Sequence, residues 1–207
     1  MGTLAPMSGE VRVSDPATMS QPIPVPRPGV HVVGVAIPVP APHGPYLQGR
    51  RAEFNDPMAW AIPAHVTILG PTEVTPADRP DFEAHLAEVA KSTRPFDVAL
   101  RGTGTFRPVS EVVFVTVIQG AAECAQLEQR TRSGRWHREL AFPFHPHVTI
   151  AHDVTSADLD RAAEELAAYH LDFAVEALWL FELGRDGQWR PQRSFAFGES
   201  SSARTPE

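Results

Sequence analysis

The sequence predicts an α+β protein made of two similar halves, in which antiparallel sheets line a central cleft, helices lie outside, and a pseudo-two-fold axis relates the halves. Two observations predict this architecture. The tetrapeptide His-Val-Thr-Ile occurs at residues 65–68 and again, without change, at 147–150. Short β-like runs also alternate with helical patterns around both copies. Two such halves would bring their matching strands together across the cleft.

Strands are expected where short runs of β-branched and aromatic residues are bounded by Pro, Gly or polar residues. In chain order these runs cover 30–37, 65–69, 96–100, 112–118 and 147–151, and two more lie near 171–181 and 194–197. Each half then has a leading strand, a strand that carries the tetrapeptide, and a third strand. The sequence matches 96–100 with 173–178 as the third strands of the two halves.

Helices are expected between these strands. At 81–90 the apolar residues Phe82, Leu86 and Val89 fall on one helical face. Thr155 followed by Asp158 resembles a capping box, and an apolar face continues from Leu159. A weaker pattern covers 121–132, and each half has room for such a helix between its leading strand and its tetrapeptide strand. Each half therefore reads as strand, helix, tetrapeptide strand, helix and strand.

Composition indicates one globular domain. The chain has 207 residues, of which 43% are hydrophobic and 21% charged. We expect a disordered, Pro-rich leader at 1–29, a folded domain at 30–198 and a flexible tail at 199–207. No apolar run approaches the roughly 18 residues of a membrane span, and no secretory signal is visible, so a cytoplasmic location is expected. We also expect a monomer, although these two observations do not bear on oligomeric state. Cys124 is the only cysteine, which excludes an internal disulfide and the common cysteine-based zinc sites.

The charge balance limits the partners. With 18 basic and 25 acidic residues the net charge is −7, and no basic stripe is evident. Proteins that track long nucleic acids usually carry one, because neutralising phosphates supplies much of their affinity. A short RNA end or a nucleotide is therefore the more reasonable partner.

The repeated tetrapeptide carries the chemistry. Residues i and i+2 of a strand share a face, so His65 projects with Thr67 and His147 with Thr149, while the Val and Ile side chains point into a core. Histidine titrates near pH 6.5, so one ring can accept a proton while the other donates one. The threonine hydroxyls can donate hydrogen bonds to phosphate oxygens. The four side chains suffice for displacement at phosphorus without a metal or another cofactor.

A single His-x-Thr would read more simply as a buried histidine and a strand-forming threonine. Two identical copies within a larger duplication favour the functional reading. A metal site built from His145, His147 and His152 is a weaker alternative, because their spacing matches no established set. Gly102 and Gly104 are expected to form a turn between strands, and Phe106 after them could stack on a base.

On its two His-x-Thr motifs, and on the strand and helix order of 30–198, the chain resembles the 2H phosphoesterase superfamily, in particular the branch of 2′-5′ RNA ligases and RNA 2′,3′-cyclic phosphodiesterases. The resemblance implies a two-lobed fold, with His65 and His147 as the acid–base pair and Thr67 and Thr149 as phosphate donors. It further implies hydrolysis of a 2′,3′-cyclic phosphate to a 2′-phosphate, or reversible joining of RNA ends through a 2′-5′ linkage. The chain has His152 where RNA-ligating members often have Arg, so His152 is expected in the substrate site but with only a partial charge.

Two alternatives remain open at this level. The first is a binding module that recognises a nucleotide or phosphorylated ligand without turnover. The second is a related esterase for another small cyclic phosphate. The intact His and Thr of both motifs favour an enzyme, since a non-catalytic descendant would not need all four side chains.

Overall fold

The computed structural model describes residues 27–198. The predicted leader therefore lies outside the described residues except for its last three positions, and the predicted tail at 199–207 lies outside them entirely. In chain order the elements are β1 (His31–Pro38), α1 (His43–Glu53), β2 (His65–Val74), α2 (Arg79–Lys91), β3 (Phe96–Thr105), β4 (Val112–Gln119), α3 (Ala121–Thr131), a 3₁₀ turn (Gly134–Trp136), β5 (His147–His152), α4 (Ser156–Glu165), β6 (His170–Val175), β7 (Ala177–Leu183) and β8 (Trp189–Ala196).

The strands form two antiparallel sheets of four strands each. One sheet has the order β2-β1-β7-β8 and the other β5-β4-β3-β6. The two orders correspond position by position, so the predicted α+β duplication is confirmed. Both tetrapeptide strands, β2 and β5, are edge strands of their sheets.

The third strand of each half belongs to the sheet of the other half. β3 pairs with β4 and β6, and β7 pairs with β1. The predicted match of 96–100 with 173–178 is therefore wrong, because that second segment spans the end of β6 and the start of β7, which lie in different sheets. Both ends of the segment are rich in strand-forming residues, so composition alone does not reveal the change of sheet at Glu176. The counterpart of β3 is β7.

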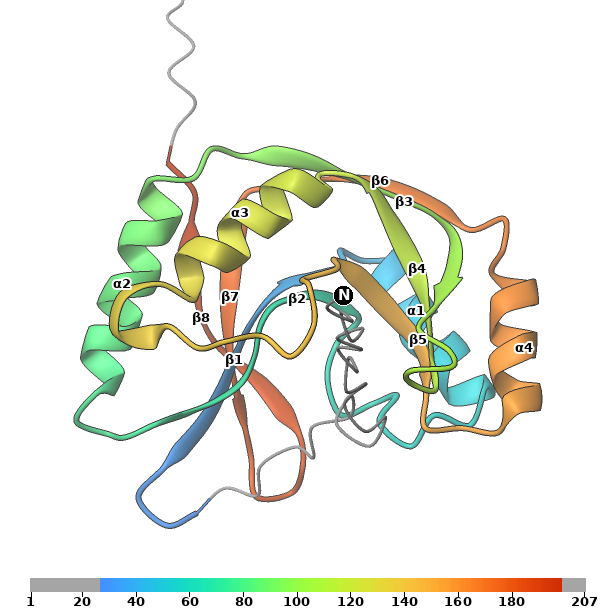
Figure 1. Cartoon of the computed structure of the whole chain (residues 1–207), viewed down its shortest axis with the longest axis horizontal. Helices are drawn as coiled ribbons and strands as arrows, with labels where there is room; N and C mark the ends of the chain where they lie inside the picture. Colours follow the sequence, from blue (N-terminus) through green and yellow to red (C-terminus); the bar gives the residue numbers. More distant parts are fainter. Residues whose placement is uncertain (1–26, 199–207) are drawn as a thin grey trace, which may run out of the picture.

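The helices cover the outer faces of the two sheets (Figure 1). α2 packs on β8 and α3 on β2, while α1 packs on β5 and α4 on β3, β4 and β5. Thr155 caps α4 as predicted, since its Oγ1 accepts a hydrogen bond from the backbone N–H of Asp158 at 3.2 Å. Thr75 makes the same contact with Asp78, also at 3.2 Å, one turn before α2.

The core fixes which way the tetrapeptides face. Val66, Ile68, Val148 and Ile150 are each at most 1% exposed and belong to one apolar cluster that both sheets share. The histidines and threonines alternate with them and so project from the opposite face of each strand, which is partly open. None of the helices found between residues 27 and 198 is both long and apolar enough to cross a membrane.

Candidate active site

Each tetrapeptide strand is held along one edge by the neighbouring strand of its sheet. His65 lies opposite Pro38 of β1, and His147 lies opposite Thr116 of β4. The regular backbone pairing and the buried Val and Ile residues leave these side chains little freedom to reorient. The imidazoles are therefore presented by two rigid strands.

A backbone carbonyl sets the tautomer of each imidazole, in the same way in both motifs. Nδ1 of His65 donates to the carbonyl of Pro63 at 2.7 Å, and Nδ1 of His147 donates to the carbonyl of His145 at 2.7 Å. In both cases the acceptor is two residues upstream. With the proton on Nδ1, each neutral ring carries its lone pair on Nε2. Nε2 of His65 lies 3.1 Å from the hydroxyl of Thr67, which can donate to it.

Burial lowers the basicity of both rings. The pKa of His65 falls from 6.5 to about 4, mainly because the ring is desolvated, although the hydrogen bond to Pro63 works in the opposite direction. The positive charge of Arg51 and the His147 ring lower this pKa further. The pKa of His147 also falls to about 4, again chiefly by desolvation. Both rings are consequently neutral at pH 7 in the free protein.

Two adjoining cavities form the cleft beside these rings. A cavity of about 440 Å³ contains His147 and Phe106 in its lining. A second of about 280 Å³ is lined by residues that include His65, Thr149 and His152. Thr67, Leu69 and Gly70 line both. The six side chains that the sequence singles out thus all border one divided cleft.

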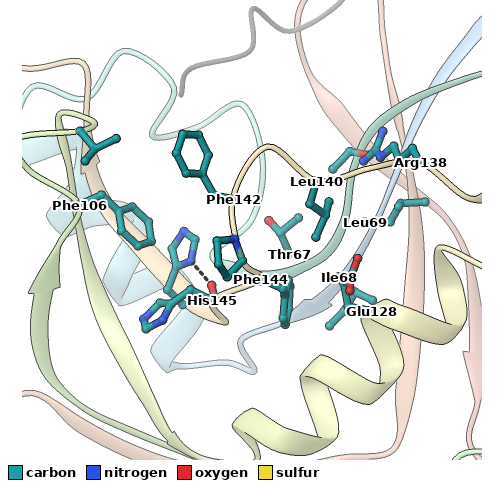
Figure 2. Close-up of a pocket in the computed structure, with 14 residues that line it drawn as sticks. Thr67, Ile68, Leu69, Phe106, Glu128, Arg138, Leu140, Phe142, Phe144 and His145 are labelled. Atoms are coloured by element: carbon teal, nitrogen blue, oxygen red, sulfur yellow. Dashed lines mark hydrogen bonds between the residues drawn. The ribbon is translucent and has the colours of Figure 1, made fainter. Parts of the chain in front are cut away.

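The larger cavity has a largely apolar and aromatic wall. In Figure 2, Phe106 and His145 lie on one side, Arg138 and Leu69 on the other, and Thr67 between them. The Phe106 ring meets the His147 ring edge-to-face, with ring centroids 5.0 Å apart. Phe142, also in the lining, is 43% exposed. Such a wall suits the flat face of a base or another apolar group.

Gly104 makes this aromatic wall possible. A Cβ on Gly104 would lie 2.6 Å from the ring of Phe114, which itself packs 4.5 Å from Phe106 and 5.1 Å from His147 between ring centroids. The prediction of a turn between strands at Gly102 and Gly104 is wrong, because both lie within β3. The chain turns only after Phe106.

His152 ends β5, and its Nε2 lies 3.3 Å from a carboxylate oxygen of Asp153. It borders the smaller cavity, away from His145 in the larger one. Across residues 27–198 no group of three or more His, Cys, Asp or Glu side chains is arranged to hold a metal ion.

Two arginines of the cleft were not anticipated from the sequence. Arg138 lies on the loop before β5 and donates to the carbonyls of Pro71 at 3.0 Å and Gly70 at 3.3 Å, which ties this loop to β2. Arg51, in the last turn of α1, lines the smaller cavity beside His65. Each lies upstream of a motif histidine, outside the strand that carries it, so the alternation of residues along that strand does not point to it.

Comparison with known proteins places the chain in a family. The model of the 2′-5′ RNA ligase superfamily matches residues 38–187, more than half of the chain. Two proteins that each carry the name "Putative phosphoesterase" are similar in sequence. The one from Bacillus mycoides is 24% identical over 74% of this chain and 90% of its own length. The one from Halalkalibacterium halodurans is 26% identical over 70% of this chain and 85% of its own.

Solved structures share the fold. Escherichia coli LigT complexed with 3′-AMP superposes with a TM-score of 0.59 at 18% identity, over 81% of this chain and 98% of that one. TT0787 of Thermus thermophilus superposes with a TM-score of 0.53 at 22% identity, over 82% and 99%. The family match spans both His-x-Thr motifs, so it shows family membership in addition to a shared fold. The chain belongs to the 2′-5′ RNA ligase superfamily and is an enzyme of the two-histidine (2H) phosphoesterase type.

Proposed function

We propose that this protein is a metal-independent cyclic phosphodiesterase that hydrolyses the 2′,3′-cyclic phosphate of a short RNA end or a nucleotide to a 2′-phosphate. The observation that carries the proposal is the matched pair of imidazoles. Each has its Nδ1 proton committed to a backbone carbonyl, which leaves the Nε2 lone pair for proton transfer. Nε2 of His65 accepts from the Thr67 hydroxyl in the free protein and becomes available when that hydroxyl donates to a bound phosphate instead. Both border one cleft that also contains both threonine hydroxyls.

In the proposed reaction a water oxygen attacks phosphorus and the bond from phosphorus to the 3′ oxygen breaks. One Nε2 takes the proton of the attacking water. The other histidine, protonated at the start, gives its Nε2 proton to the departing 3′ oxygen. The hydroxyls of Thr67 and Thr149 donate to the non-bridging oxygens, on which negative charge accumulates in the transition state.

Binding of the substrate favours protonation of one histidine. Both rings are neutral at pH 7 in the free protein because burial lowers each pKa to about 4. A bound phosphate anion favours the charged form of an adjacent imidazole and so raises its pKa. The same groups in the same roles would join a 2′,3′-cyclic phosphate to a 5′ hydroxyl that takes the place of water, and the product would have a 2′-5′ linkage.

Charge and shape favour a short substrate. The chain carries a net charge of −7, which disfavours long stretches of phosphate backbone. The larger cavity is wide enough for one base, and its wall carries Phe106, Phe142 and Phe144. A base held there would leave its ribose cyclic phosphate close to the histidines.

The test is hydrolysis of a nucleoside 2′,3′-cyclic phosphate by the full chain with EDTA present, followed by ³¹P NMR to distinguish the 2′-phosphate from the 3′-phosphate. Wild type is compared with His147→Ala and with His170→Ala, an exposed histidine on β6 that lines neither cavity. We expect turnover in wild type and His170→Ala and loss of roughly a hundredfold or more in His147→Ala. Turnover that EDTA abolishes and zinc restores would contradict the metal-free mechanism. Absence of turnover in a folded wild type would point to another cyclic phosphate or to a binding role.

A further inference from the structure

Arg51 is unusual because it is a buried cation that borders the smaller cavity. Only 5% of its side chain is exposed, and it shares that cavity with His65, Thr67, Thr149 and His152. Among the residues lining this cavity, all within the described range, it alone carries a permanent positive charge. Arginine is rarely so deeply buried unless it is paired.

Asp56 provides the partner and fixes the orientation of the guanidinium. Its Oδ2 accepts from Nε of Arg51 at 3.0 Å and from Nη2 at 2.7 Å. Its Oδ1 accepts from the backbone N–H of Met58 at 2.8 Å, and the carboxylate is completely buried. Two of the three guanidinium nitrogens are therefore committed to one rigid carboxylate.

The third nitrogen, Nη1, is not bonded to Asp56 and can donate to a ligand. It makes no hydrogen bond with any residue between 27 and 198. In this part of the chain the buried side-chain nitrogens and oxygens without a partner are Arg50 Nε and Thr131 Oγ1. Nη1 is not among them, so it retains access to open space. Because Arg51 lines the smaller cavity and only 5% of its side chain is exposed, the geometry assigns that open space to the cavity.

The cavity needs such a donor if an anion is to bind. With both histidines neutral at pH 7, the two motifs offer only neutral groups to an incoming phosphate. An arginine is charged at every relevant pH, and a charge-assisted hydrogen bond to a phosphate oxygen is about twice as strong as a neutral one. Asp56 removes the cost of orienting the guanidinium when the anion arrives.

We propose that Arg51 is a phosphate-binding residue of this cleft, with Asp56 holding it so that Nη1 donates to a non-bridging oxygen of the substrate phosphate between the two His-x-Thr motifs. This assignment rests on the proposed function for its substrate but needs only an anion for its test. Arg51 would then take part in binding from the first encounter, before either histidine is protonated.

The experiment measures binding of inorganic phosphate to the full chain at pH 7 by calorimetry, for wild type, Arg51→Gln, Arg51→Lys and the control Arg50→Gln. Arg50 carries the same charge one position earlier but pairs with Glu53 and Glu165 and lines neither cavity. We expect Arg51→Gln to weaken binding roughly ten- to a hundredfold and Arg50→Gln to change it less than about twofold. Equal affinity of the two Gln variants, or no phosphate binding by wild type, would overturn the proposal.

The Lys variant covers a failure of Arg51→Gln to fold. Lysine keeps the charge, but its single nitrogen cannot replace both the Asp56 contacts and the Nη1 contact, so phosphate affinity should fall severalfold. Unchanged affinity in Arg51→Lys would overturn the proposal. NMR titration of the His65 ring gives a second readout, because loss of the Arg51 charge should raise the pKa of His65. If Arg51 only stabilised the loop between α1 and β2, its replacement would not change phosphate affinity.

Parallel assays with a cyclic phosphate separate this proposal from the proposed function. If wild type hydrolyses the cyclic phosphate and Arg51→Gln and Arg50→Gln hydrolyse it equally well, the proposed role of Arg51 is wrong, while the proposed activity stands. If wild type shows no turnover but its phosphate binding depends on Arg51, the proposed activity is wrong, while the proposed anion site stands.

Discussion

Replacing His147 with Asn should make the fold less sensitive to acid. The pKa of His147 is about 4 in the folded protein and returns to about 6.5 on unfolding. Between these values the unfolded chain binds more protons, so the free energy of unfolding decreases as the pH falls from 6.5 toward 4. From pH 7 to pH 5 this difference amounts to about 2 kcal/mol for one such histidine, and to about 1 kcal/mol if solvent in the cleft halves the shift.

Asn is the appropriate replacement because its amide N–H can still donate to the carbonyl of His145, whereas it does not titrate. The assay is urea unfolding of wild type, His147→Asn and the surface control His170→Asn at pH 7 and pH 5. The loss of unfolding free energy between the two pH values should be about 1 to 2 kcal/mol smaller in His147→Asn than in wild type. Equal losses in these two proteins would refute the claim that burial holds this ring neutral.

Three further outcomes are expected from the cleft. Thr67→Val and Thr149→Val should each lower kcat roughly a hundredfold with little change in KM, because a hydroxyl that donates to developing negative charge acts in the transition state. Steady-state kinetics with a cyclic phosphate would test this, and an effect on KM alone would contradict it. Gly104→Ala should destabilise the fold by about 1 to 3 kcal/mol in thermal melts, since its Cβ would collide with Phe114. Gly49→Ala, which meets no neighbour in α1, is its control. The pH optimum of kcat/KM should lie below that of kcat, because bound phosphate raises the histidine pKa.

The sequence was most informative where a local pattern repeated. The identical tetrapeptides predicted the two strands that carry them, the alternation of buried and cleft-facing side chains, and the presence of both motifs at one cleft. Thr155 predicted the start of α4 because capping depends on residues only three positions apart. These features follow from neighbouring residues, which a single sequence displays directly.

The features that the sequence did not reveal depend on tertiary contacts. The strand at 173–178 was matched to β3 because its composition suits either sheet, and only pairing with β3 or β1 decides where each part belongs. Arg51 resembles an ordinary surface residue of a polar helix, and only the packing of α1 against the rest of the fold buries it beside the smaller cavity. Gly102 and Gly104 carry a turn signal, but the crowded ring of Phe114 explains the second of them better.

The exchange of third strands explains why such a cleft can be rigid. An edge strand has one side without a partner and is usually the more mobile part of a sheet. Here each tetrapeptide strand is an edge strand, yet it packs under a helix of the opposite half, α3 on β2 and α1 on β5. β7 also pairs with β1 and β3 with β4, so each sheet contains strands from both halves. A large change in the separation of His65 and His147 would therefore disrupt the apolar core that both strands share.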